Sequence, residues 1–134
     1  MRPITWFASV ICLVLSTTSH AQESTEAACD ALAQAAQSGC LEKLATAADA
    51  ELNDVYRRAV IMIGKSDSKN TAEWKTELRK TEQAWIAFRD SDCGALVGYE
   101  WGLGSGMGAA TERCLLQKTR QRTHDLVDRY INRR

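Results

Sequence analysis

The chain has 134 residues, of which 45% are hydrophobic and 25% charged, and its 17 basic and 17 acidic side chains give a formal net charge of zero. This length allows one domain with a modest core and excludes several. The charges are unevenly placed, because residues 23–54 carry seven acids and one lysine whereas residues 113–134 carry seven bases and two acids. We interpret these segments as neighbouring helices that attract each other, in preference to a basic tail that binds nucleic acid or an anionic surface.

Residues 1–21 have the pattern of an export signal. Arg2 precedes an apolar run over residues 4–15, and the S-H-A sequence at 19–21 is a small-x-small cleavage site. The run is short for a membrane span, and Cys12 lacks the small preceding residue that a lipidated cysteine needs. We expect a signal peptide over 1–21, one domain over 22–134, and a periplasmic or secreted protein without a stable membrane anchor; a retained signal anchor is the less favoured alternative.

Two helices are predicted in the first half of the domain. The alanine-rich residues 26–37 favour a short helix that ends at Gly39. From Leu41 to Ile63 apolar residues recur at three- and four-residue spacing, which predicts a long amphipathic helix ending at Gly64. Residues 65–69 are small and charged and form a predicted loop.

A third helix is predicted to begin at Asn70, which with Glu73 has the spacing of a capping box. It is expected to continue through Leu96 to Trp101 despite two intervening glycines. Its predicted core face consists of Trp74, Leu78, Thr81, Trp85 and Phe88.

A glycine-rich loop and a last helix complete the chain. Six of the eight glycines fall between residues 94 and 108, and we expect a flexible loop over 98–108. The last helix is predicted over about 109–131, with a stripe of Leu115, Thr119, Arg122, Leu126 and Tyr130. Strand alternation and internal repeats are absent from the sequence. We therefore predict an all-α fold, a small antiparallel helical bundle of three long helices plus a short N-terminal helix.

Four cysteines lie outside the signal, namely Cys29, Cys40, Cys93 and Cys114. An even count in a small exported domain indicates two disulfides, for which three pairings exist. We favour Cys29–Cys40 and Cys93–Cys114. A continuous helix would hold Cys29 and Cys40 roughly 16 Å apart, beyond disulfide reach, so we expect a helix break at Ser38-Gly39. The cysteines lack C-x2-C spacing, which disfavours a four-thiolate metal site, and we expect no metal and no cofactor.

The sequence does not indicate catalysis. His124, the one histidine outside the signal, has Asp125 beside it and Asp128 one turn on. That pattern fits a base with an orienting carboxylate, but it is more often a solvated surface group. Ser105 in G-S-G-M-G lacks the strand that precedes a nucleophile elbow. We predict no catalytic residues and a protein that is not an enzyme.

Several polar residues lie on or beside apolar stripes. Thr119 and Arg122 lie on the stripe of the last helix, Asn53 borders that of the second and Arg89 that of the third. A buried arginine costs several kcal/mol unless it is paired. These side chains therefore either extend to water or form a polar layer that sets the register of the helices. We favour the layer for Arg122 and leave both readings open for Arg89.

The aromatic, glycine-rich loop is the best candidate for a binding surface, because exposed tyrosine and tryptophan are frequent anchors of protein interfaces. The alternative is that Trp101 folds back onto the bundle and the glycines only turn the chain. The residues that we assign to partner binding are Tyr99, Glu100, Trp101, Leu103 and Met107.

Three motifs carry a resemblance to a known family. They are Leu52-Asn53-x-x-Tyr56, Gln83-x-Trp85-x-x-Phe88-Arg89-Asp90-x-x-Cys93, and Cys114 followed by Thr119-x-x-Arg122-x-x-x-Leu126. Over about residues 29–126 the chain resembles the lysozyme inhibitor LprI-like family of exported bacterial proteins. The resemblance implies a small helical protein of the periplasm or exterior, and the name-giving member inhibits lysozyme. It implies structural roles for Asn53, Tyr56, Gln83, Trp85, Phe88, Arg89, Asp90, Thr119 and Arg122.

We therefore expect an exported binding protein that inhibits lysozyme-type cell-wall hydrolases. Such enzymes commonly carry two carboxylates in a cleft, which a protruding loop can occupy, and the acidic region 23–54 would match a basic enzyme. The alternative is an adaptor or structural module that binds another envelope protein. The expected partner is in both cases a protein and not a nucleic acid.

Overall fold

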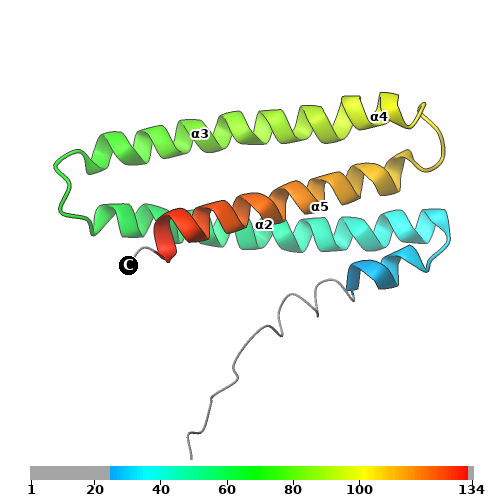
Figure 1. Cartoon of the computed structure of the whole chain (residues 1–134), viewed down its shortest axis with the longest axis horizontal. Coiled ribbons are helices and arrows are strands. Elements are labelled where there is room, and N and C mark those ends of the chain that lie inside the picture. The colour runs from blue at the N-terminus through cyan, green and yellow to red at the C-terminus, as the bar shows by residue number, and fades with distance from the viewer. Residues whose placement is uncertain (1–24, 133–134) are drawn as a thin grey trace, which may run out of the picture.

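The computed structural model describes residues 25–132 and shows an all-α bundle, which confirms the predicted fold class (Figure 1). A short helix over residues 25–30 comes first. It is followed by α2 (Gln34–Gly64), α3 (Thr71–Ser91), the π-helical turn η1 (Asp92–Leu96), α4 (Val97–Glu100), α5 (Met107–Leu126) and the π-helical turn η2 (Val127–Ile131). The predicted export signal over 1–21 lies outside the described residues. Among residues 25–132, none of the helices is long and apolar enough to cross a membrane.

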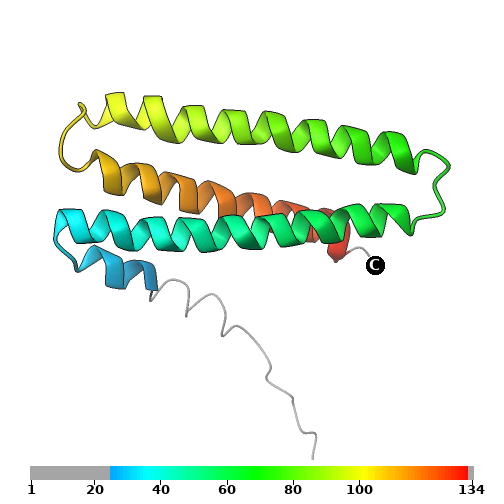
Figure 2. The ribbon, with the colours of Figure 1, turned by 180° about the vertical axis from the view of Figure 1, so that it is seen from behind.

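The helices run antiparallel in chain order. Helix α5 packs along α2, and α3 with η1 and α4 runs along one side of this pair (Figure 1). The turn after α4 closes one end of the bundle and the loop after α2 closes the other. Figure 2 shows the short N-terminal helix folded back beside the start of α2.

Helix α2 forms the centre of the core, as its regular apolar spacing predicts. Its buried residues are Leu41, Ala48, Leu52, Val55, Ala59 and Ile63. One apolar cluster joins α2 to Leu78 of α3 and to Leu126 and Tyr130 at the C-terminal end. A second cluster joins Leu41 to Leu116 of α5 and to Cys29 at the opposite end. The core therefore extends along the whole bundle with α2 in common.

The Cys29–Cys40 disulfide forms as predicted, with 5.6 Å between the Cα atoms, but the predicted helix break at Ser38-Gly39 is wrong. The chain turns at residues 31–33, where the Leu32 amide donates to the Cys29 carbonyl and Ala33 is extended. Gly39 lies inside α2. A turn immediately after Cys29 folds the short helix back onto α2 and brings the two cysteines together, so the helix has no need to end at Gly39.

Helix α3 differs most from its predicted face. Only Leu78 and Glu82 are buried in it, and Trp74 and Trp85 pack against the core from partly buried positions. Phe88 is 54% exposed, so its predicted place in the core is wrong. Thr81 is exposed as well and bonds the Glu77 carbonyl. Asn70 precedes the helix without a side-chain cap, contrary to the predicted capping box.

Glu82 and Arg89 lie on the inner face of α3 because side chains of the neighbouring helices form hydrogen bonds with both. Glu82 accepts hydrogen bonds from the Arg122 guanidinium of α5, with Nε 3.1 and 3.2 Å from the two carboxylate oxygens. These side chains are only 10% and 14% exposed. The carboxylate of Glu82 raises the pKa of Arg122 despite burial. The predicted polar layer at Arg122 is therefore present in the structure.

Arg89 makes a second polar contact across the bundle. Its Nη1 lies 2.8 Å from Asp49 Oδ1 on α2 and 3.1 Å from Thr119 Oγ1 on α5. Its side chain is 14% exposed and also pairs with Asp90. Burial lowers the pKa of Arg89, and the hydrogen bonds to the two carboxylates outweigh it, so that the pKa is raised. Arg89 thus belongs to the polar layer and does not extend freely to water.

The acidic N-terminal segment pairs with the basic face of α5, in agreement with the charge pattern. Glu26 binds Arg113 and Arg120 at 3.0 and 2.8 Å. Asp30 binds Arg113 too, and this hydrogen bond is the main cause of the lowered pKa of Asp30. These contacts and the Cys29–Cys40 disulfide hold the short helix on the bundle.

We expect Arg122→Met to destabilise the fold by about 3 kcal/mol, because it leaves the buried Glu82 carboxylate without its partner. The double variant Glu82→Leu/Arg122→Met removes both charges and is expected to recover most of this loss. Urea unfolding of the oxidised protein at neutral pH measures both. A single variant as stable as the original protein would contradict the polar layer.

Glu112 provides a test by pH. Burial, and secondly the charge of Glu42, raise its pKa in the folded state. A carboxyl group with a raised folded pKa contributes stability below its unfolded pKa and loses it as the pH rises through the folded value. We therefore expect Glu112→Gln to raise the urea midpoint at pH 7 and to leave it almost unchanged near pH 3. Glu42→Gln should act in the same direction with a smaller effect, and a lower midpoint at pH 7 for Glu112→Gln would refute this account.

Candidate partner-binding surface

The chain between α4 and α5 is a defined turn, although a flexible loop was predicted. The Gly102 amide donates to the Tyr99 carbonyl at 3.0 Å and the Leu103 amide to the Gly98 carbonyl at 2.9 Å. This pair of bonds is the Schellman motif, which needs a left-handed residue after the helix. Gly102 supplies it with φ 60°, and Leu103 follows with φ 56°. A leucine in this region costs about 1 kcal/mol, and such strain concentrates at functional sites.

The tip of the turn is apolar and open to solvent. The exposed fractions are 75% for Tyr99, 56% for Trp101 and 68% for Leu103. Glu100 is exposed beside them. Met107 is half-buried, and its sulfur faces Gly98 at the base of the turn. Four of the five predicted residues are thus exposed within residues 99–103, whereas Met107 packs at the base of the turn.

Trp101 is exposed and also folds back onto the chain, which are the two alternatives considered from the sequence. A Cβ atom on Gly106 would lie 2.7 and 2.9 Å from carbons of the indole ring. The ring therefore covers Gly106 while more than half of the side chain stays exposed. The glycine allows a close approach that holds the indole in place.

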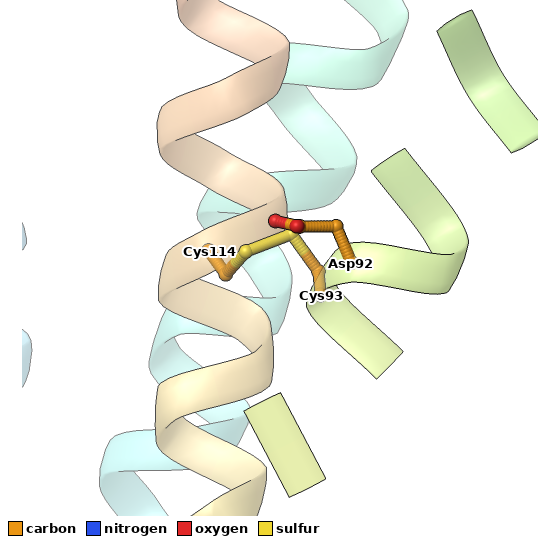
Figure 3. Close-up of side chains that lie close together, drawn as sticks. All are labelled: Asp92, Cys93 and Cys114. Atoms are coloured by element: carbon orange, nitrogen blue, oxygen red, sulfur yellow. A yellow bond between two sulfur atoms is a disulfide. The ribbon is translucent and has the colours of Figure 1, made fainter. Parts of the chain in front are cut away.

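A disulfide fixes the base of this surface (Figure 3). Cys93 of η1 bonds Cys114 of α5, with Cα atoms 5.4 Å apart. Asp92 lies beside the bridge, so that one oxygen and two sulfurs fall within 4.8 Å of one another. The two sulfurs are bonded to each other and Asp92 pairs with Lys118 of α5 at 3.0 Å. This cluster is a structural link between two helices and does not offer thiolates to a metal.

Six residues of the three sequence motifs meet in the polar layer rather than at the turn. Asn53 donates to the backbone oxygen of Asp49 at 2.9 Å, and Asp49 in turn binds Arg89. Both arginines also make cation–π contacts with Trp85. The guanidinium carbons of Arg89 and Arg122 lie 5.2 and 6.0 Å from the centroid of its ring. The motif residues joined in this way are Asn53, Trp85, Arg89, Asp90, Thr119 and Arg122.

Three further motif residues lie elsewhere. Tyr56 packs against the core, whereas Gln83 and Phe88 are exposed. Sequence reasoning missed Asp49 and Glu82, which neutralise the two arginines. The signal for Glu82 was its position on α3, four residues after Leu78 and three before Trp85, on the face that the helix buries.

His124 is exposed, and its acidic neighbours have other partners. Asp125 accepts a hydrogen bond from Gln121, and Asp128 accepts one from Asn132. The surface reading of His124 is therefore the better one.

Comparison with known proteins agrees with the motif resemblance. The family model described as lysozyme inhibitor LprI matches residues 24–126. A protein of Rhizobium meliloti (strain 1021), described as uncharacterized, is 35% identical over 95 residues, which cover 66% of this chain and 68% of that protein. None of the solved structures matches. The extent of the family match shows that this chain belongs to the lysozyme inhibitor LprI family.

Proposed function

We propose that this protein inhibits lysozyme-type cell-wall hydrolases by placing the end of α4 and the turn that follows it, together residues 99–106, in their active-site cleft. The observation that carries the proposal is the exposure of Tyr99, Trp101 and Leu103, each more than half open to solvent, on a turn stapled at its base. Family membership supports the same function. The proposal includes an exported protein that is not an enzyme, and the two disulfides are consistent with an oxidising compartment.

The geometry of the turn suits inhibition by occupation. A retaining or inverting glycosidase places two carboxyl groups roughly 5 to 9 Å apart on either side of the bond that it cleaves. A protruding turn with large rings fills such a cleft without any chemistry of its own. The backbone hydrogen bonds and the disulfide order the turn before binding, which lowers the entropy cost of association.

The acidic N-terminal region contributes less than the sequence suggested. Glu26 and Asp30 are neutralised by Arg113 and Arg120, and Asp49 binds Arg89. These acids hold the bundle together, so the interaction with an enzyme rests mainly on the turn and its surroundings.

The turn side chains provide the direct test. We expect the mature, oxidised protein to slow lysis of cell walls by at least one lysozyme of a panel of types. Trp101→Ala and Leu103→Gly should each weaken inhibition about 30-fold, the effect of losing a central anchor worth about 2 kcal/mol. Glycine is chosen at position 103 because it accepts φ 56° and preserves the turn.

The matched control is Ile61→Ala, since Ile61 on α2 is 54% exposed and outside the turn. It should inhibit as the original protein does. Absence of inhibition across the whole panel would refute the proposal and favour the envelope adaptor. If the turn variants inhibit as strongly as the original protein, the enzyme must contact another surface of this protein.

Gly106→Ala tests the pre-ordering of Trp101. The added methyl would overlap the indole ring, which must swing away. We expect inhibition about tenfold weaker and a shifted indole N–H signal of Trp101 in NMR spectra. Gly94→Ala is the control, because its Cβ meets nothing within 4 Å, and equal effects of both substitutions would contradict a role for the close contact.

A further inference from the structure

Exposed apolar side chains gather beyond the turn, on the outer side of α3, η1 and α4. Three of the nine large exposed hydrophobic residues of the described chain lie there. Phe88, Leu96 and Tyr99 are 54%, 50% and 75% exposed. They line a surface groove of about 450 Å³ together with Ser91, Asp92 and Ala95. An apolar groove with a polar rim marks an interaction site.

The π-helical turn η1 places Leu96 on the same face of the helix as Phe88. Hydrogen bonding from i to i+5 adds one residue to the turn. Leu96 therefore takes the position that a residue seven places after Phe88 has in an α-helix, two turns away on the same face. Such insertions occur frequently at functional sites. In a regular α-helix Ala95 would take the position two turns after Phe88. The groove would then be lined there by a methyl group instead of the larger Leu96 side chain.

The contacts around Phe88 hold the groove open. Lys118 of α5 lies 4.9 Å from the Phe88 ring centroid and pairs with Asp92 at 3.0 Å. The Cys93–Cys114 disulfide joins η1 to the same helix. The aromatic wall is thus fixed from two sides before any partner arrives.

The charge near the groove is acidic. Asp92 pairs with Lys118, and Asp90 and Asp49 share Arg89. Glu100 is exposed next to Tyr99, so that the acids of this region outnumber the two bases with which they pair. Two copies facing each other through this groove would oppose like charges, which disfavours self-association. A basic partner would be complementary.

We propose that this groove anchors a protein partner that presents an apolar side chain flanked by lysine or arginine. Tyr99 lines the groove and lies in the last turn of α4, two residues before Trp101, so the groove adjoins the turn that follows α4. The identification of the partner with a lysozyme rests on the proposed function. The groove extends that function by a second contact outside the enzyme's cleft.

Calorimetry with a lysozyme that the protein inhibits gives the first test. Phe88→Ser/Leu96→Ser should weaken binding at least 30-fold, whereas Ile61→Ser/Met62→Ser, which alters two exposed residues of α2, should weaken it less than threefold. Circular dichroism confirms that both variants remain folded. Glu100→Lys, a surface change that spares packing, should weaken binding about fivefold and reduce its dependence on salt. If the groove variants bind as tightly as the original protein, the groove is refuted and the proposed function stands.

A second test does not depend on lysozyme. The probe is a blocked hexapeptide in which two arginines flank a phenylalanine and a leucine, and its control carries glutamates in place of the arginines. At millimolar concentration the basic peptide should shift the amide NMR signals of Phe88, Leu96 and Tyr99, and the acidic peptide should bind at least fivefold more weakly. If none of the lysozymes binds, the proposed function fails. The peptide titration alone then decides whether the groove binds a basic, apolar partner. Shifts that are absent from the groove, or equal for both peptides, overturn the inference.

Discussion

The fold depends on two arginines that hold α3 against the rest of the bundle. This helix fully buries only Leu78 and Glu82, and Trp74 and Trp85 pack against the core from partly buried positions. Arg122 meets Glu82 from α5, and Arg89 reaches from α3 to Asp49 and Thr119. Hydrogen-bonded charges of this kind add little net stability but tolerate few alternative arrangements, because an unpaired buried charge is costly. They therefore set the register of α3.

The family motifs have a common physical meaning in this network. Asn53 holds Asp49, Asp49 binds Arg89, and Arg89 reaches Thr119. Trp85 lies within 6.0 Å of both guanidinium groups, and cation–π contacts of this kind add further stabilisation. The motifs are thus the residues that assemble three helices around two charges. They identify the scaffold, whereas the surface that we propose for partner binding lies outside most of them.

The sequence predicted what local periodicity determines. The apolar spacing of α2, the helix-ending Gly64, the pairing of the cysteines and the exposed aromatic turn all follow from local rules. The face of α3 did not, because hydrophobicity ranks Phe88 above Arg89 as a core residue. In the structure Arg89 is the more buried residue of the two, because it forms hydrogen bonds with Asp49 of α2 and Thr119 of α5. These partners become neighbours of Arg89 only in the folded bundle. The helix break before α2 escaped prediction for a similar reason, since the alanine-rich sequence favours helix at residues 31–33 as well.

The inner contacts of Arg89 explain why Phe88, at the C-terminal end of α3, stays at the surface. Leaving Phe88 in water forgoes about 2 kcal/mol of burial, and a rotation of α3 by about 100°, the angle between adjacent residues of a helix, would turn Phe88 to where Arg89 now lies. Arg89 is held by Asp49 and Thr119, and four residues later Cys93 is bonded to Cys114, so this rotation would break both connections. Phe88, Leu96 and Tyr99 consequently remain at the surface for as long as the inner contacts last. The exposed groove is a product of the same interactions that stabilise the fold, which is the property expected of a binding surface that must exist before its partner arrives.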